Sequence, residues 1–446
     1  MLLGIDIGTT KTAAVIVDAE GGVLAAASHA HGAALSVPAG RAEQDPAQLL
    51  HSAWAAVGEL PADLRRAVSA VGLTGQMHSV VLLDRHGDPL TPLITWQDGR
   101  CLEEPRFLPE LEARIGYALR TGYGCASIVW RQEHGGLPAG TACAADMPDL
   151  AGARLCGLAC PPIDPTFAAS WGLFDLAVFD WDCAAVAKAG IPKGLLPEVR
   201  PSGATAGVVT PAMAQRLGIP AGTSVAVAVG DNQASLLATL GDPVRDIALT
   251  LGTAGQLSVV VPRGEQPAPA GECAPWEYRP YPGGRLVLVA AALCGGAAWA
   301  WLVDSYARCL REMGQAEPDR EWLFARMDEL GRLATEELTV ETHFLGERHD
   351  EGLRGAIRGI DLRNFGMGPL ARGLARGIVR NLREMLPEAA LAGRTRVVGS
   401  GNALRRSALL RSMVESEFRL PLVMAEGREE AATGAARLAA ESVRGA

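Results

Sequence analysis

The stretch that decides the fold is LLGIDIGTTKTAAVIVD, residues 2–18. Apolar residues run almost without interruption on both sides of a short polar segment, Gly8-Thr9-Thr10-Lys11-Thr12. Two apolar runs separated by a polar turn that contains glycine are typical of a β-hairpin. The glycine lets the backbone approach an anion, while the hydroxyl groups, the backbone N–H groups and Lys11 can donate to it. The turn therefore resembles a phosphate site, although its glycine spacing excludes the P-loop motif. Taken alone, a plain hairpin turn is the alternative, and Asp6 adds to the case for a phosphate.

Asp6 stands inside the first apolar run of this hairpin. A carboxylate is costly to bury unless it has a partner. Beside a phosphate-binding turn, Mg²⁺ is a suitable partner, bound directly or through water. The alternative is that nearby backbone amides satisfy the Asp6 carboxylate.

The hairpin pattern occurs a second time in the chain. LGIDIGTTKTAAVIV (3–17) aligns without a gap with IALTLGTAGQLSVVV (247–261), so that Gly8 and Thr9 correspond to Gly252 and Thr253. A chain of 446 residues also exceeds what one core usually holds. We therefore predict two duplicated domains, residues 1–243 and 244–446.

Helix and strand patterns alternate after each hairpin, as expected for an α/β protein. Asp45 and Pro46 mark the start of a helix. Further elements are expected as a strand at 67–76, a strand and helix at 224–241, helices at 295–310 and 368–386, a strand at 395–401, and a strand and last helix at 420–442. Residues 263–275 are expected to form a connecting loop.

Composition excludes several classes of protein. The formal net charge of −9 and the absence of basic runs argue against a nucleic-acid partner. The nine cysteines include no CxxC pair, so neither a disulfide framework nor a zinc site is indicated. The uncharged stretch Leu286–Val303 contains Gly295-Gly296, which favours a buried strand followed by a buried helix over a membrane span. The N-terminus lacks a basic leader, so we expect a cytoplasmic protein without a membrane partner.

A second carboxylate of interest is Asp231, in the stretch AVAVGDNQAS (226–235). It follows a buried strand and precedes a helix, which is the edge of the sheet where α/β proteins bind ligands. Asp231 could accept a proton from an alcohol that attacks a phosphoryl group. The alternative is an ordinary helix cap.

Two turns in the second half could hold a nucleotide. Gly252-Thr253 repeats the phosphate-binding turn of the first half. In VVGSGNALRRS (397–407), Gly399 and Gly401 lie between a strand and the start of a helix, which suits a phosphate or a ribose.

Polar and aromatic residues suited to a small hydroxylated ligand occur in the first half. They are Gln76, Met77 and His78, then Trp96, Asp98 and Arg100, and finally Tyr123. Aromatic faces can pack against the C–H surfaces of a sugar, while amides, imidazole and carboxylates bind its hydroxyl groups. Structural roles are the alternative, with Asp98 and Arg100 forming a local salt bridge.

Taken together, these motifs resemble the FGGY carbohydrate kinases, a branch of the actin-like ATPases. The matching stretches occur in the family's order across nearly the whole chain: GIDIGTTKT, AEQDP, GQMH, TWQDGR, GDNQAS, LGTAGQ, GERHDEGLRGAIRGI and EEAATGAARLAA. Within the family, TWQDGRC and TGYGCASIVW are most similar to the kinases of sedoheptulose, a seven-carbon ketose. GQMH is also found in the xylulose kinases.

The resemblance implies two actin-like, ribonuclease H-like domains with a cleft between them, and ATP and Mg²⁺ as cofactors. Asp231 would be the general base and would share the metal with Asp6. The implied nucleotide contacts are Gly8, Thr9, Thr10, Lys11, Thr12, Gly252, Thr253, Gly296, Gly399, Gly401 and Asn402. The implied sugar contacts are Gln76, Met77, His78, Trp96, Asp98, Tyr123, Asp231 and Asn232.

We therefore predict an ATP-dependent kinase that phosphorylates the primary hydroxyl of a ketose, with sedoheptulose as the substrate. Its partners would be the sugar, ATP and ADP, and a homodimer is left open. Phosphorylation of xylulose or another pentulose is the alternative within the family. A catalytically inactive actin-like protein that binds sugar or nucleotide is the alternative of another class.

Overall fold

The computed structural model describes residues 1–444 except 117, 266–273, 317, 349 and 428. The chain forms two compact units. The first comprises Met1–Thr239, Pro280–Gly284 and Gly427–Ala446, and the second comprises Leu240–Arg279 and Arg285–Glu426. The predicted domains, 1–243 and 244–446, stay a prediction, and the units differ from them chiefly in where they place the C-terminal segment.

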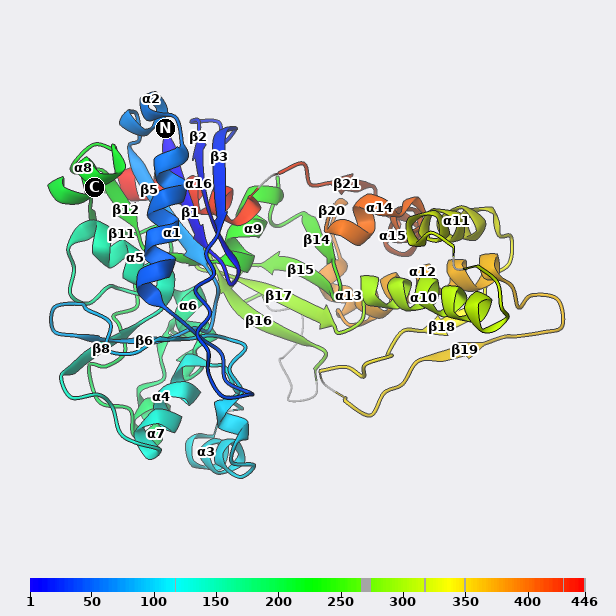
Figure 1. The fold of residues 1–446 in the computed structure, drawn as a ribbon, viewed down its shortest axis with the longest axis horizontal. Coiled ribbons are helices and arrows are strands. Elements are labelled where there is room, and N and C mark those ends of the chain that lie inside the picture. Colours follow the sequence, from blue (N-terminus) through cyan, green and yellow to red (C-terminus); the bar gives the residue numbers. More distant parts are fainter. Residues whose placement is uncertain (117, 266–273, 317, 349, 428, 445–446) are drawn as a thin grey trace. The chain divides into compact units, whose positions relative to one another are not determined.

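The first unit is built on a mixed sheet with strand order β11-β12-β5-β1-β2-β3 (Figure 1). β2 is antiparallel to both of its neighbours, β1 and β3, whereas β1, β5 and β12 are parallel to one another. A short strand, β13, also pairs with β5 beyond the end of β12. The strands are β1 Leu2–Ile7, β2 Lys11–Val17, β3 Val23–Ala30, β5 Ala70–Gly75, β11 Thr205–Val208, β12 Ser224–Ala226 and β13 Val229–Gly230.

The opening hairpin forms as the sequence predicts. β1 pairs with β2 from Leu2 opposite Val17 to Ile7 opposite Thr12. The turn is closed by a hydrogen bond from the backbone N–H of Gly8 to the carbonyl of Lys11 at 3.0 Å. Ile5 and Ile7 are fully buried, so the apolar residues on both sides of Asp6 anchor the strand in the core.

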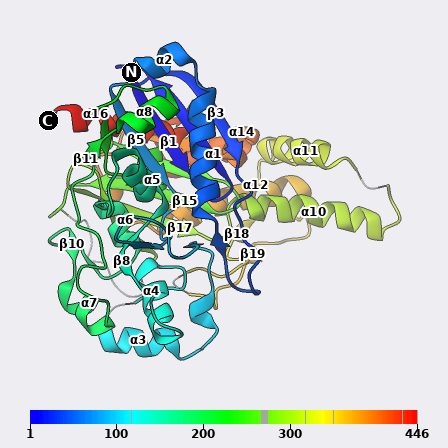
Figure 2. The same ribbon diagram turned by 60° about the vertical axis from the view of Figure 1, so that its left-hand side comes forward.

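Helices cover both faces of this sheet. α1 packs on β2 and β3, whereas α16 packs on β1 and β5 from the opposite face (Figures 1 and 2). As predicted, Asp45 caps α1, accepting a hydrogen bond from the N–H of Ala47. The helices of this unit are α1 Pro46–Glu59, α2 Ala62–Arg66, α3 Phe107–Ile115, α4 Gly124–Glu133, α5 Met147–Cys156, α6 Pro165–Ser170, α7 Cys183–Ala189, α8 Pro211–Leu217, α9 Asp231–Thr239, α16 Glu430–Arg444 and the 3₁₀ helix Arg100–Leu102.

Short antiparallel pairs of strands complete the first unit. They are β4 Glu43–Gln44 with β7 Leu93–Ile94, β6 Val81–Asp84 with β8 Thr141–Ala145, and β9 Phe174–Asp175 with β10 Asp180–Trp181.

The second unit contains a sheet with strand order β16-β17-β15-β14-β20-β21. β14 and β15 form the second predicted hairpin, and β14, β20 and β21 are parallel. The strands are β14 Asp246–Leu251, β15 Gly255–Val261, β16 Trp276–Tyr281, β17 Arg285–Ala292, β20 Arg396–Ser400 and β21 Leu422–Met424, with β18 Thr339–Glu341 paired to β19 Ala356–Arg358.

Buried leucine, valine and alanine side chains pack the helices of the second unit against its sheet. The helices are α10 Gly296–Glu312, α11 Arg320–Leu333, α12 Met367–Glu384, α13 Glu388–Leu391, α14 Asn402–Arg406 and α15 Ala408–Phe418. The uncharged stretch from Leu286 runs through β17 into α10, as predicted. Among the described residues, no helix combines the length and the apolar character needed to cross a bilayer. Most of the expected loop at 263–275 lies outside the described residues.

The two units share one topology. In the first, two antiparallel neighbours, β2 and β3, lie on one side of β1, and two parallel neighbours, β5 and β12, lie on the other. In the second, the antiparallel strands β15 and β17 lie on one side of β14, and the parallel strands β20 and β21 lie on the other. β14 therefore corresponds to β1. The duplication inferred from the repeated hairpin therefore extends to the strand order of each sheet.

Glycines let α16 approach the backbone of its neighbours. Gly4 and Gly72 are partners on β1 and β5, and a Cβ atom on either would lie 1.9 Å from a carbonyl oxygen of α16. A Cβ atom on Gly434 would lie 1.7 Å from the carbonyl oxygen of Ala234 in α9. These separations leave no room for a methyl group, so the packing of α16 depends on glycine at these positions.

We expect Gly434→Ala to lower the free energy of unfolding by about 3 kcal/mol, because the added methyl group forces α16 away from α9. Gly58→Ala is the matched control. Gly58 is also helical, but a Cβ atom there meets nothing within 4 Å. That substitution should raise stability by up to about 1 kcal/mol, since alanine favours the helix. Urea unfolding measures both, and equal effects would contradict the close contact.

Candidate functional site

Asp6 occupies a central position in the first unit. It lies near the end of β1, opposite Thr74 on β5 and Ala13 on β2. Its Oδ1 atom is buried and has no hydrogen-bond partner among the described residues. Burial, together with the charges of Asp231 and Glu429, raises the pKa of Asp6 to about 7. The alternative in which backbone amides satisfy this oxygen is therefore not what the structure shows.

Asp231 approaches Asp6 from the other side of β5. β13 pairs with β5 so that Gly230 faces Gly75, which in turn faces Ile7 on β1. Asp231 is the next residue and begins α9, as the sequence predicts. Strands two places apart in a sheet are separated by roughly 10 Å, so carboxylates at their ends can act on a common ligand. The effect of Asp231 on the pKa of Asp6 reflects this proximity.

The residues present fit a bound magnesium ion. Among the described parts of the chain, no cluster of three or more His, Cys, Asp and Glu side chains is placed to hold a metal. Mg²⁺ does not need such a cage, since it commonly binds one or two carboxylates together with water and substrate phosphates. The unpartnered, buried Oδ1 of Asp6 is the kind of oxygen that such an ion would use.

The turn after β1 is only partly as expected. Thr10 is exposed, and the Nζ atom of Lys11 lies 2.6 and 2.8 Å from the carboxylate oxygens of Glu429, just before α16. Thr12 is fully buried, and its hydroxyl pairs with that of Ser52 at 2.6 Å. The Thr12 side chain on β2 thus points to α1, which does not favour the expected phosphate contact of Thr12. Glu429 has no role in the sequence-based prediction.

Trp96 and Gln76 are both linked to Thr9. The indole N–H of Trp96, which is 48% exposed, donates to the Thr9 hydroxyl at 3.0 Å. The side-chain amide of Gln76 donates to Gln44 at 2.7 Å, and Gln44 donates to the Thr9 carbonyl at 2.7 Å. Two predicted sugar contacts and one predicted phosphate contact therefore lie in one network. Gln44 connects them, and the matching AEQDP stretch is the sequence signal that includes it.

His78, Tyr123 and Met77 also lie near one another and near the strand that precedes Asp231. The rings of His78 and Tyr123 are stacked, with centroids 4.8 Å apart. His78 has a positive φ of 69°, uncommon for a non-glycine residue. The sulfur of Met77 packs against Gly230, where an added Cβ atom would lie only 2.8 Å from it. On the other side, the backbone N–H of Asn232 donates to Oδ1 of Asp231 at 2.7 Å.

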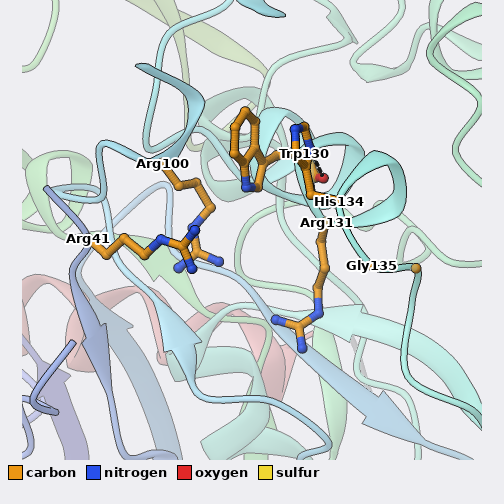
Figure 3. Close-up of a pocket in the computed structure, with 7 residues that line it drawn as sticks. Arg41, Arg100, Trp130, Arg131, His134 and Gly135 are labelled. Carbon is orange, nitrogen blue, oxygen red and sulfur yellow. Dashed lines mark hydrogen bonds between the residues drawn. The ribbon is translucent and has the colours of Figure 1, made fainter. Parts of the chain in front are cut away.

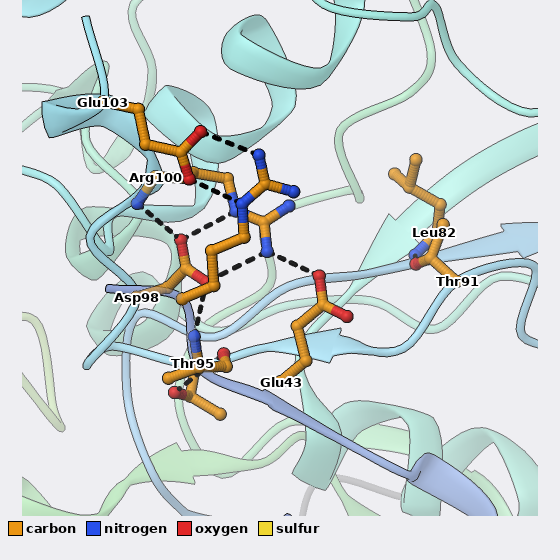
Figure 4. Close-up of polar contacts among 9 residues, drawn as sticks. Glu43, Leu82, Thr91, Thr95, Asp98, Arg100 and Glu103 are labelled. Carbon is orange, nitrogen blue, oxygen red and sulfur yellow. Dashed lines mark hydrogen bonds and ion pairs between the residues drawn. The ribbon is translucent and has the colours of Figure 1, made fainter. Parts of the chain in front are cut away.

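Asp98 is placed differently from the other predicted sugar contacts (Figure 4). Its side chain is fully buried and binds the guanidinium group of Arg100 through both oxygens, at 2.7 and 2.9 Å. It also accepts from the backbone N–H groups of Ala42 and Arg100. Arg100 is further bound to Glu43 at 2.6 Å. The geometry favours the local salt bridge over the sugar contact.

A small cavity of about 220 Å³ lies beside this salt bridge, lined by Arg41, Arg100, Trp130, Arg131 and His134 with two glycines (Figure 3). Arg41 is bound to Glu103 through two hydrogen bonds. His134 stacks on Trp130 with ring centroids 3.6 Å apart. Two of the three guanidinium groups are thus neutralised by carboxylates, so the cavity is not strongly cationic.

The predicted nucleotide residues of the second unit converge at one end of its sheet. The N–H of Gly296 donates to the carbonyl of Gly252 at 2.8 Å, and the N–H of Gly295 donates to that of Thr253 at 3.0 Å. Gly401 has a φ of 93°, and a Cβ atom there would lie 2.3 Å from the carbonyl oxygen of Leu251. Gly399 pairs with Leu249, and Asn402 begins α14. The turns after β14 and β20 and the start of α10 therefore form one cluster.

Comparison with known proteins decides the family. Residues 1–238 match the N-terminal domain of the FGGY family of carbohydrate kinases, and residues 247–443 match its C-terminal domain. The chain belongs to the FGGY family of carbohydrate kinases. It is a sugar kinase by membership, and the predicted two-domain α/β fold is confirmed.

Several FGGY kinases resemble it over nearly their whole length. Sedoheptulokinase from Homo sapiens is 34% identical over 471 residues, covering 97% of this chain and 96% of the human protein. Sedoheptulokinase from Mus musculus is 33% identical over 466 residues, with the same coverage. The structure of xylulose kinase from Rhodospirillum rubrum superposes with a TM-score of 0.82 at 27% identity, covering all of this chain and 90% of that one.

We expect Asp98→Asn to lower the free energy of unfolding by about 3 kcal/mol, because it removes the charge that faces buried Arg100. The Michaelis constant for the sugar should change less than about threefold. Asp88→Asn, in an exposed pair with Arg154, is the control and should cost about 0.5 kcal/mol or less. An unchanged stability with a Michaelis constant raised tenfold or more would instead make Asp98 a sugar contact. Urea unfolding and a coupled ADP assay measure the two quantities.

Proposed function

We propose that this FGGY kinase transfers the γ-phosphoryl group of ATP to the primary hydroxyl of a ketose, converting sedoheptulose to sedoheptulose 7-phosphate. The observation that carries the reaction is the convergence of Asp6 and Asp231 at the carboxyl ends of β1 and β13, on either side of β5. The choice of sugar is supported by the similarity to two sedoheptulokinases over 97% of the chain.

In the proposed reaction Asp231 accepts the proton of the attacking hydroxyl as its oxygen approaches the γ-phosphorus. The backbone N–H of Asn232 donates to Oδ1 of Asp231 and thereby orients the carboxylate group. Asp6, with Asp231, would hold Mg²⁺, which supplies positive charge to the phosphate oxygens. No covalent enzyme intermediate is required, since positioning and electrostatic stabilisation suffice for this transfer.

The sugar would lie against the network that joins Trp96, Gln76 and Thr9, with the stacked His78 and Tyr123 rings beside it. Met77 and Asn232 would complete this surface. The exposed face of Trp96 suits the C–H side of a ketose, whereas His78 and Gln76 suit its hydroxyl groups. In the first unit, Gly8, Thr9 and Thr10 are proposed contacts of the ATP phosphates. In the second unit, Gly252 and Thr253 are proposed phosphate contacts, and Gly296, Gly399, Gly401 and Asn402 are proposed nucleoside contacts.

Xylulose remains the second candidate sugar, since a xylulose kinase structure superposes over the whole chain. A catalytically inactive sugar-binding protein is the alternative of another class. The placement of both carboxylates argues against it. A protein that only binds a sugar does not need a base beside a buried carboxylate that is suited to bind a metal ion.

We expect sedoheptulose to give the highest kcat/KM in a coupled ADP assay over a panel of ketoses that includes xylulose, ribulose and fructose. A preference over xylulose of tenfold or more corresponds to about 1.4 kcal/mol of transition-state discrimination, which a few contacts can supply. Phosphorus NMR of the product should place the phosphate on the terminal carbon. A hundredfold preference for xylulose would replace the proposed substrate but leave the ketose kinase assignment intact.

We expect Asp231→Asn to lower kcat by at least about a hundredfold, because the amide cannot accept the proton. Asparagine begins a helix as well as aspartate does, so α9 should be preserved and sugar binding should change less than about threefold. Asp182→Asn, the same change at the start of α7, is the control and should leave kcat unchanged. Turnover near the wild-type value in Asp231→Asn would remove this residue from its proposed role.

A further inference from the structure

The segment that carries Asp231 is held by side chains as well as by the sheet. β12 ends at Ala226, and β13 begins only at Val229. The backbone N–H of Ala228 donates to Oδ1 of Asp149 at 3.2 Å. The backbone N–H of Gly230, directly before Asp231, donates to the hydroxyl of Thr166 at 2.7 Å. The peptide that leads into the proposed base is therefore anchored by buried polar side chains of α5 and α6.

The direction of the Thr166 hydroxyl is fixed by Asp164. Thr166 Oγ1 donates to Asp164 Oδ1 at 2.5 Å, and the N–H groups of Thr166 and Phe167 donate to the same oxygen at 2.9 and 3.0 Å. The hydroxyl of Ser202 binds Oδ2. Because a hydroxyl has one proton and gives it here to Asp164, its lone pairs face the N–H of Gly230.

Asp164 is more than an ordinary helix cap. Its side chain is fully buried, as is that of Asp146, and Asp149 is nearly so. Burial raises the pKa of Asp164 to about 6, so the carboxylate is mostly charged at neutral pH. Burying a carboxylate is costly, and a cap at the surface would satisfy the first turn of α6 without that cost. The buried position is what lets the Thr166 hydroxyl reach Gly230.

The other end of α6 holds His78. The backbone N–H of His78 donates to the hydroxyl of Ser170 at 3.0 Å, and His78 Nδ1 lies 2.6 Å from the carbonyl oxygen of Ser170. Ser170 in turn donates to the carbonyl of Phe167 at 2.7 Å. These contacts fix the orientation of the His78 ring and stabilise its backbone conformation with a positive φ.

We infer that α6 is a positioning element for the phosphoryl transfer, with Thr166 placing Asp231 and Ser170 placing His78. The inference rests on the proposed function, in which Asp231 is the base and His78 contacts the sugar. One short helix then sets the distance between the base and the hydroxyl that it deprotonates. Thr166 and Ser170 are positioning residues, since neither is proposed to touch the sugar or the nucleotide.

The test compares Thr166→Val with Thr166→Ser. Valine has the shape of threonine but cannot accept from Gly230, so kcat should fall about tenfold to a hundredfold while KM for the sugar changes less than about threefold. Serine keeps the hydroxyl and should restore kcat to within about threefold of the wild-type value. A kcat within twofold of wild type in Thr166→Val would overturn the inference, as would a Thr166→Ser variant as slow as Thr166→Val.

Thr91→Val is the matched control. Thr91 is also a buried threonine of the first unit, and its hydroxyl accepts from the backbone N–H of Leu82 at 3.1 Å (Figure 4). This variant loses the same kind of hydrogen bond and should show a comparable fall in melting temperature without a fall in kcat. Equal losses of kcat in the two valine variants would mean that only general destabilisation is at work. If Thr166→Val does not fold, Thr166→Ala, which adds no methyl group against Gly230, takes its place with the same expected kcat.

Ser170→Ala should change KM for the sugar rather than kcat. His78 keeps its ring contact but loses the acceptor for its backbone N–H, so KM should rise about threefold to tenfold with kcat within threefold of wild type. An unchanged KM would remove Ser170 from the inference. In an Asp231→Asn background, Thr166→Val should have no further effect on kcat, since its action passes through Asp231. A normal turnover of Asp231→Asn alone would instead refute the proposed role of Asp231 as base, on which this inference rests.

Discussion

The site depends on a carboxylate that is buried in the middle of a sheet. Asp6 lies on β1 between fully buried isoleucines, and one of its oxygens has no hydrogen-bond partner among the described residues. Water would satisfy that oxygen on an exposed strand, and a basic side chain would satisfy it in a purely structural role. Instead, burial and then the charges of two further carboxylates, Asp231 and Glu429, raise its pKa to about 7. The arrangement disfavours negative charge until a cation arrives, as expected where a metal and phosphates bind together.

Much of the fold follows from local sequence patterns. Both hairpins, the Asp45 cap of α1 and the start of α9 at Asp231 are visible because apolar periodicity, turn residues and capping residues act over short distances. The equivalence of the two sheets follows from one gapless repeat. The predicted nucleotide residues also converge within the second unit, because each ends a strand or begins a helix at the same edge of its sheet.

The residues that the sequence left out are those paired over long distances. Lys11 binds Glu429, 418 positions away, and Gln76 is linked to Thr9 through Gln44. Thr166 meets Gly230 across 64 positions. Nothing in a periodicity or a turn indicates such pairs, since they arise when separate segments pack. The same limit explains Asp98, which the sequence grouped with the sugar contacts although it could equally pair with Arg100, as it does.

Close packing explains why a segment at the end of the chain belongs with a site at its beginning. α16 lies against Gly4 and Gly72, partners on the two parallel strands that carry Asp6 and flank Asp231. At that distance the helix cannot slide without opening the sheet, since carbonyl oxygens occupy the space of absent methyl groups. α16 therefore holds β1 and β5 from one face, while α6 holds the Gly230 peptide through Thr166. The backbone segments that carry both carboxylates are thus held by contacts of neighbouring helices.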